Sequence, residues 1–192
     1  TFNGEDILDI IVKQPACARF IARHLYNFFV ADEPQVPNWS TEPPRDPDAI
    51  DIIATAIIKS NFEMRSVLRT LFRSPFFKEA RFTKVKSPTE VAVGTYKLVG
   101  GQSFPRPGYS DIARQPTLMG QELLNPPSVE GWHTGQEWVN SGSLMSRINF
   151  VADLVGDTNL PGIQGIMLRL KAQGELSPTA LVDGCLNLLG PL

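Results

Sequence analysis

The sequence predicts an all-α protein, an irregular bundle of several helices joined by long, ordered loops rich in Pro and Gly. Three observations predict this class. Apolar residues recur at three- and four-residue spacing in most segments between turn signals, which is the period of an amphipathic helix. No run alternates apolar and polar residues over the length of a β-strand. The 16 Pro and 15 Gly residues imply short helices with abrupt ends.

Length and composition are those of one ordinary globular domain. The chain has 192 residues, 42% of them hydrophobic and 20% charged, so we expect a single helical domain over residues 1–192. A helix start at the first residues and a helix stop at the last ones suggest that both ends are cut points of a longer polypeptide. The net charge of −2 argues against a general nucleic-acid binder. No apolar run reaches the roughly 20 residues of a membrane span.

Two helices are predicted in the first 31 residues. Asn3 is a predicted N-cap for a short helix that ends near Gln14 and buries three isoleucines, Ile7, Ile10 and Ile11. The second helix covers residues 15–31 and begins with Pro at its first position. Its polar residues form only a narrow stripe, made of Arg19, Arg23 and Asn27. We therefore expect neighbours on two or three sides of this helix.

Residues 33–48 are dense in Pro and polar side chains and predict an irregular loop anchored by Trp39. Asp46 followed by Pro47 marks the next helix start, and apolar residues then recur at helical spacing up to Ser60. The same spacing resumes from Met64 to Phe72 and predicts a helical hairpin packed on the helix at 15–31. The second helix of this hairpin carries an arginine stripe that we interpret as a solvated face, with an anion or partner patch as the alternative.

The remaining helices follow from their caps. Ser87-Pro88-Thr89-Glu90 fits a capping box and predicts a helix to about Val99. A turn-rich loop is expected over residues 100–108, and a helical pattern split or kinked by Pro116 over residues 109–124. Ser143 is a predicted cap for a helix that turns five apolar residues inward, Leu144, Ile148, Val151, Leu154 and Val155. A turn at residues 161–165, a short helix at 166–170 and a last helix after Ser177 complete the bundle.

Cys17 and Cys185 are the only cysteines and both fall on apolar helix faces, where a free thiol behaves as a small core residue. A disulfide between them is the alternative if the first and last helices touch. Histidine is equally scarce, because His24 and His133 are the only two. We interpret His24 as a core or boundary residue beside Phe20.

The candidate binding loop is the aperiodic segment at residues 125–142. Loops of this length in compact domains are usually functional or packed surface elements. Trp132 and Trp138 either pin the segment to the core or offer an aromatic platform for a sugar or peptide. His133 and Glu137 are four residues apart and suit a proton-transfer pair, although two ligands do not make a metal site.

Arg147 and Gln121 complete the candidate site. Arg147 stands in the first turn of its helix, where the helix dipole disfavours a cation, so it suits a buried ion pair or a grip on an anion. Lys84 and Lys86 either serve the same site or are simply solvated. The sequence contains no GxSxG elbow, HExxH pair, P-loop or GxGxxG turn, and we therefore expect no cofactor, no metal and no catalytic centre of this chain's own.

Several stretches resemble the bacterial family known as domain of unknown function 1800. They are FNGEDILDIIVKQPACARFIARHLYNFFVADEP, LFRSPFF, KVKSPTE and MGQELLNPPSVEGWHTGQEWVNSGSLMSRINF, in this order and across nearly the whole chain. The resemblance places the chain in the C-terminal part of a protein more than twice its length. It offers no established catalytic residues, and Cys17 stands where Thr is common in the family.

The resemblance also implies an extracytoplasmic location, periplasmic or secreted. As a partner it implies a sulfatase-like protein of the family domain of unknown function 1501, or the N-terminal half of the same polypeptide. We therefore favour a scaffold or interaction domain of an exported protein. One alternative is part of a hydrolase acting on carbohydrate or sulfated polymers, with the rest of its cleft outside this chain. Another is a subunit of a larger surface assembly, which exposed apolar helix faces would support.

Overall fold

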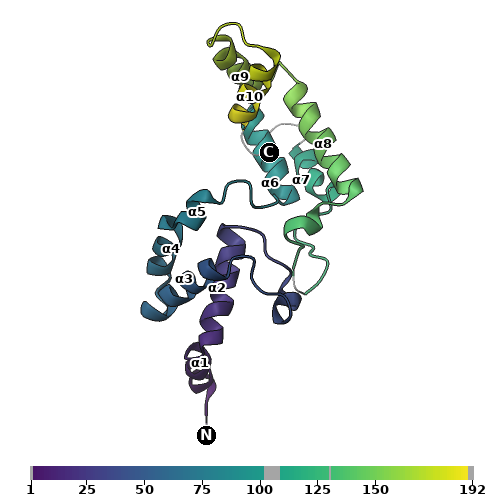
Figure 1. The fold of residues 1–192 in the computed structure, drawn as a ribbon. Helices are drawn as coiled ribbons and strands as arrows, with labels where there is room; N and C mark the ends of the chain where they lie inside the picture. The colour runs from purple at the N-terminus through teal and green to yellow at the C-terminus, as the bar shows by residue number, and fades with distance from the viewer. Residues whose placement is uncertain (1, 102–108, 130, 190–192) are drawn as a thin grey trace. The chain divides into compact units, whose positions relative to one another are not determined.

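The computed structural model describes residues 2–101, 109–129 and 131–189. These residues form ten α-helices and two short 3₁₀ helices (Figure 1). Within the described ranges the only β-type pairing is an isolated bridge between Ser128 and Gly131, so the predicted all-α class is confirmed. The chain divides into two compact units, Thr1–Lys84 and Val85–Leu192. The expectation of one domain over residues 1–192 stays a prediction.

The first unit is built on two helices that lie side by side. Its elements are α1 (Gly4–Val12), α2 (Pro15–Phe29), η1 (Val36–Ser40), α3 (Pro47–Lys59), α4 (Met64–Arg73) and α5 (Pro75–Glu79). Ala18 and Ala22 of α2 are completely buried, and these small side chains let α3 approach closely with Ile53 and Ile57. Each buried isoleucine contributes about 1.5–3 kcal/mol. The helical hairpin of α3 and α4 and its packing on α2 are therefore as predicted.

The surroundings of α1 and α2 differ from the prediction. Asn3 caps α1 in a capping box with Asp6, as expected, yet α1 buries no residue and Ile7, Ile10 and Ile11 are exposed. In α2, Phe20 and Phe28 are exposed, whereas Arg23 of the supposed polar stripe is buried. The predictions failed because helical spacing indicates which residues share a face but not whether another element covers it.

The second unit is arranged around its first helix. Its elements are α6 (Pro88–Val99), α7 (Tyr109–Leu118), η2 (Gly135–Trp138), α8 (Ser141–Gly156), α9 (Pro161–Lys171) and α10 (Pro178–Leu189). Helix α6 begins with the predicted capping box of Ser87 and Glu90, and α7, α8 and α9 all pack against it. Val91, Ala92, Met119 and Phe150 form the core of this packing.

Helix α9 meets the end of α6 at a glycine. A Cβ atom added to Gly162 would lie 1.9 Å from the carbonyl oxygen of Leu98 and 2.8 Å from that of Val99. Only glycine therefore allows this contact between two backbones. The predicted turn at residues 161–165 is instead the first part of α9, because Pro161 occupies the N1 position and Gly162 serves packing rather than a turn.

Two other helix boundaries were misjudged. Helix α7 ends at Leu118 and not at residue 124, because Pro116 stands in its last turn and Gly120 follows with a positive φ of 98°. Helix α8 is capped by Asn140, and Ser143 is its third residue within a capping box. Leu144 and Ile148 are consequently exposed, and the buried face of α8 carries Ser143, Arg147 and Phe150. The loop predicted at 100–108 falls largely outside the described residues.

Cys17 and Cys185 are both free thiols, and each is partly buried in its own unit. No helix among the described residues is both long and apolar enough to cross a membrane.

Candidate functional site

The predicted binding loop is fastened to the second unit through its two tryptophans. Trp138 is buried in η2, and its carbonyl oxygen accepts a hydrogen bond of 2.8 Å from the Ser143 hydroxyl. Trp132 is half-buried, and its indole Nε1 donates to the carbonyl oxygen of Glu122 at 3.3 Å. Both aromatic residues therefore act as pins that hold the segment in place.

His133 and Glu137 form an exposed pair on this segment. Nδ1 of His133 lies 2.9 Å from Oε2 of Glu137, and the imidazole ring meets the Trp138 ring edge-to-face with centroids 5.9 Å apart. The 3₁₀ turn of η2 brings the two side chains together on the solvent side. A carboxylate that accepts from Nδ1–H leaves Nε2 free as a proton acceptor, which is the arrangement of a general base.

Gln121 is buried and already engaged. Its Oε1 accepts from the backbone N–H of Thr89 at 2.9 Å and from the Thr89 hydroxyl at 2.7 Å. Thr89 stands in the first turn of α6, where a backbone N–H has no partner within the helix. Gln121 thus fastens the end of α7 to the start of α6, and this use of its carbonyl oxygen favours a structural role.

Arg147 is the most unusual side chain of the candidate site. It is only 9% exposed, and its Nη1 donates to the carbonyl oxygen of Lys86 at 2.7 Å. Nε and Nη2 are also buried, and neither atom has a hydrogen-bond partner among the described residues. Burial lowers the pKa of Arg147, since desolvation disfavours the charged form. Among the described residues no carboxylate pairs with it, so one edge of a guanidinium is left without a counter-charge.

The structure brings the predicted residues together in two groups. His133, Glu137 and Trp138 are in mutual contact, whereas Gln121 and Arg147 both bind the chain at the start of α6. Lys84 belongs to the first unit, where its ammonium donates to the carbonyl oxygen of Asn27 and lies 3.7 Å from Asp32.

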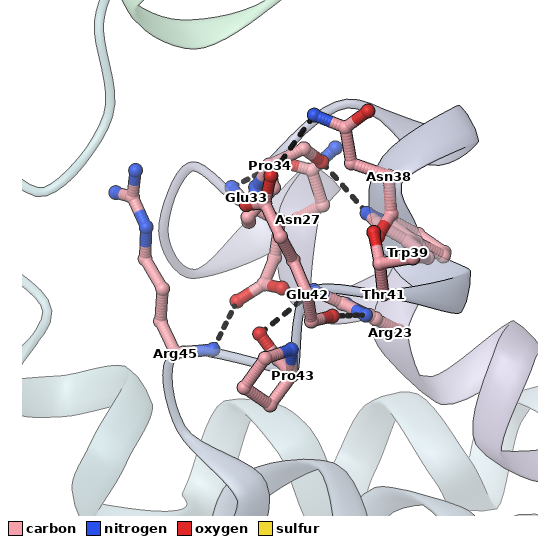
Figure 2. Close-up of polar contacts among 10 residues, drawn as sticks. All are labelled: Arg23, Asn27, Glu33, Pro34, Asn38, Trp39, Thr41, Glu42, Pro43 and Arg45. Carbon is pink, nitrogen blue, oxygen red and sulfur yellow. Dashed lines mark hydrogen bonds and ion pairs between the residues drawn. The ribbon is translucent and has the colours of Figure 1, made fainter.

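A polar cluster in the first unit was not predicted (Figure 2). Arg23 of α2 donates from Nε to Glu33 at 2.6 Å, from Nη1 to the carbonyl oxygen of Glu42 at 3.0 Å and from Nη2 to that of Pro43 at 3.1 Å. Glu33 also accepts from the backbone N–H of Arg45 at 3.0 Å. The guanidinium therefore ties both ends of the Pro-rich segment to α2.

Trp39 closes this cluster, as its predicted role of anchor requires. Its indole Nε1 donates to the carbonyl oxygen of Pro34 at 2.7 Å, and the guanidinium carbon of Arg23 lies 4.6 Å from its ring centroid. The ring also contacts Phe20 and His24 of α2. Because every donor that Arg23 directs into the cluster finds an acceptor, we interpret the cluster as structural. Arg23 and Glu33 are ten residues apart on different elements, and no local spacing rule reports such a pair.

The part of the chain that the structure describes contains no group of three or more His, Cys, Asp or Glu residues placed to hold a metal ion.

Comparison with known proteins gives one match. The model of the family described as "Protein of unknown function (DUF1800)" matches residues 1–191. No curated protein and no solved structure matches the chain. The family match runs through both units and includes every residue of the candidate site. The chain therefore belongs to the DUF1800 family of proteins of unknown function.

Proposed function

We propose that this chain is a helical scaffold and interaction domain of an exported bacterial protein, with no catalytic centre of its own. Its partner surface is the segment at residues 125–142 and the residues around it. The partner is a sulfatase-like protein or the N-terminal half of the same polypeptide, in the periplasm or outside the cell.

The observation that carries this proposal is the exposure of apolar side chains on a fastened segment. Leu124 and Val129 are almost fully exposed, with 95% and 107% of their reference surface open to solvent. Two tryptophan pins on either side of His133 hold the backbone in place. A fixed backbone that presents apolar groups loses little conformational entropy on binding, which favours protein recognition.

Arg147 is not part of this partner surface. Its Nε and Nη2 are buried, so a partner that binds the folded protein does not reach them. Its Nη1 donates to the carbonyl oxygen of Lys86 and joins α8 to the chain before α6. Recognition at this surface therefore rests on the exposed apolar side chains of the fastened segment.

Cross-linking of the full-length protein in its native cells tests the proposal. We expect cross-links from residues 125–142 to a second protein or to the N-terminal half. The Val129→Asp variant should lose them, whereas the same substitution at Leu168, an exposed leucine of α9, should leave them unchanged. Recovery of the native protein without any such cross-link, together with turnover of a substrate, would contradict the proposal.

One observation favours a second function, part of a hydrolase acting on carbohydrate or sulfated polymers. The His133–Glu137 pair is exposed beside an aromatic ring, as a general base in a sugar-binding cleft would be. The side chains of Gln121 and Arg147 are buried, so neither residue contributes a functional group to such a cleft. Assays of the full-length protein on such polymers, with His133→Gln and Glu137→Gln, test this alternative. Equal turnover by both variants and the unchanged protein would exclude it.

A further inference from the structure

The second unit contains an apolar cavity that the proposed function does not use. It lies where the end of α8 meets α9 and α10 and has a volume of about 460 Å³. Most of its lining side chains are aliphatic, among them Val155, Ile163, Ile166, Met167, Leu176 and Leu181. Pockets that bind small molecules have volumes of roughly 300–1,000 Å³ and mostly apolar linings, so this cavity falls in their range.

The cavity is formed by the way in which the helices pack. Ile163 and Leu170 of α9 are buried in its wall. At Gly184 of α10 an added Cβ atom would lie 2.7 Å from Cδ2 of Leu170, so the two helices are in direct contact there. α9 and α10 therefore touch at Gly184 and Leu170, and the cavity is the space between the helices beside this contact.

Two polar side chains line this otherwise apolar space. Lys171 stands at the end of α9, and Thr158 follows α8. No described acidic residue forms an ion pair with Lys171. The cavity therefore offers a long apolar surface with one positive charge and one hydroxyl group.

We propose that this cavity binds a single-chain amphiphile with an anionic head group, a fatty acid or its close equivalent. The alkyl chain would lie among the aliphatic side chains and the carboxylate against Lys171. The proposal is independent of the partner surface at residues 125–142.

Cys185 provides a direct reporter, because its thiol lines the cavity. In a Cys17→Ser background, the rate of Cys185 modification by a maleimide is measured against increasing decanoate, below the concentration at which micelles form. We expect saturable protection. Octanoate should bind about 15-fold more weakly than decanoate, because each buried methylene changes affinity by about fourfold.

Matched variants locate the ligand. Ile166→Trp places an indole ring in the cavity and should weaken protection, whereas Leu168→Trp on the outer face of α9 should not. Lys171→Met should weaken the binding of decanoate about two- to fivefold. Arg169 is a cation of the same helical turn that does not line the cavity, and Arg169→Met should leave the affinity unchanged.

The proposal fails if decanoate leaves the Cys185 rate unchanged. It also fails if decyltrimethylammonium, with the same chain and opposite charge, protects equally well, or if octanoate and decanoate protect alike. These three measurements need no cavity variant, so they decide the question even if Ile166→Trp does not fold. None of them touches the cross-links of residues 125–142, and failure here therefore leaves the proposed function standing.

Discussion

Arg23 and Glu33 form a buried ion pair, with 2.6 Å between Nε and Oε2 and side chains that are 6% and 0% exposed. An ion pair at this depth holds a segment in place, because removing one partner leaves the other charged and desolvated. Arg19 and Asp51 make the matching pair on the surface of the same unit, each 52% exposed. Comparing the two pairs separates the stability that a buried ion pair contributes from the stability that an exposed one contributes.

We expect Glu33→Gln to lower the free energy of unfolding by about 3–5 kcal/mol, the usual cost of breaking a buried pair. Asp51→Asn should cost at most about 1 kcal/mol, because water screens the exposed pair. Urea unfolding followed by circular dichroism measures both. Equal losses in the two variants would show that the Arg23 cluster is open to water.

Trp39 should stabilise the first unit through its hydrogen bond to Pro34 as well as through the packing of its ring. Trp39→Phe keeps an aromatic ring beside Arg23 but removes the indole donor to Pro34, so we expect a loss of about 1 kcal/mol. Trp39→Ala should lose about 3–5 kcal/mol, as large-to-small substitutions of packed aromatic residues do. Thermal unfolding of both variants tests this order, and equal losses would contradict a role for the hydrogen bond.

His24 should make the first unit sensitive to mild acid. Although His24 is exposed, the Phe20 and Trp39 rings beside it partly desolvate the imidazole and lower its pKa below the usual 6.5, so the folded state favours the neutral form. The unfolded chain then binds the proton more readily, and stability falls as the pH drops from about 6.5 through the lower native pKa. The midpoint of thermal unfolding, measured from pH 7.5 to pH 5, should depend on pH less in His24→Gln than in the unchanged protein. A pH dependence that survives in the variant would contradict this assignment.

The capping boxes of α1 and α6 should differ in their importance. Ser87 caps α6, on which the second unit packs, whereas Asn3 caps α1, which buries nothing. Ser87→Ala should therefore lower the free energy of unfolding by about 1 kcal/mol, the typical value for a lost N-cap. Asn3→Ala should reduce helical content slightly and leave the unfolding midpoint unchanged. A larger shift for Asn3→Ala would mean that α1 is packed in solution.

Arg147 should be a residue whose removal costs little stability. Arg147→Met deletes a buried cation with an unpaired edge, and we expect the free energy of unfolding to stay within about 1 kcal/mol of the starting value or to rise. Phe150→Ala, one turn along the same face, should lose about 3–5 kcal/mol. Denaturant titration compares the two. A large loss for Arg147→Met would instead show that its hydrogen bond to the carbonyl oxygen of Lys86 stabilises the unit.

Local signals in the sequence predicted much of the fold. Asn3, Asp46 and Ser87 are the caps that their side chains indicate, because an N-cap depends on atoms only two or three residues away. The cap of α8 was misplaced, since Asn140 and Ser143 are both good caps and the structure uses the first, with Ser143 as its partner in the capping box. The exposed α1 shows a further limit of sequence analysis. An amphipathic pattern indicates which residues share a helix face, but not whether another element covers that face.

The candidate site was predicted only in part, for similar reasons. His133 and Glu137 meet because four-residue spacing in a turn is a local relationship. The bonds from Gln121 to Thr89 and from Arg147 to the chain at Lys86 span tens of residues, and only the packing of α6 with α7 and α8 creates them. The sequence suggested a buried ion pair or an anion for Arg147, but burial with an unpaired edge is visible only in three dimensions.

The geometry of the apolar cavity depends on Gly162, although this residue contributes no side chain to the cavity wall. Any larger residue there would push the start of α9 away from the α6 carbonyl groups, and the adjoining Ile163, part of the cavity wall, would move with it. A mutation at residue 162 would thus retune ligand fit from a distance, through the spacing of two helices.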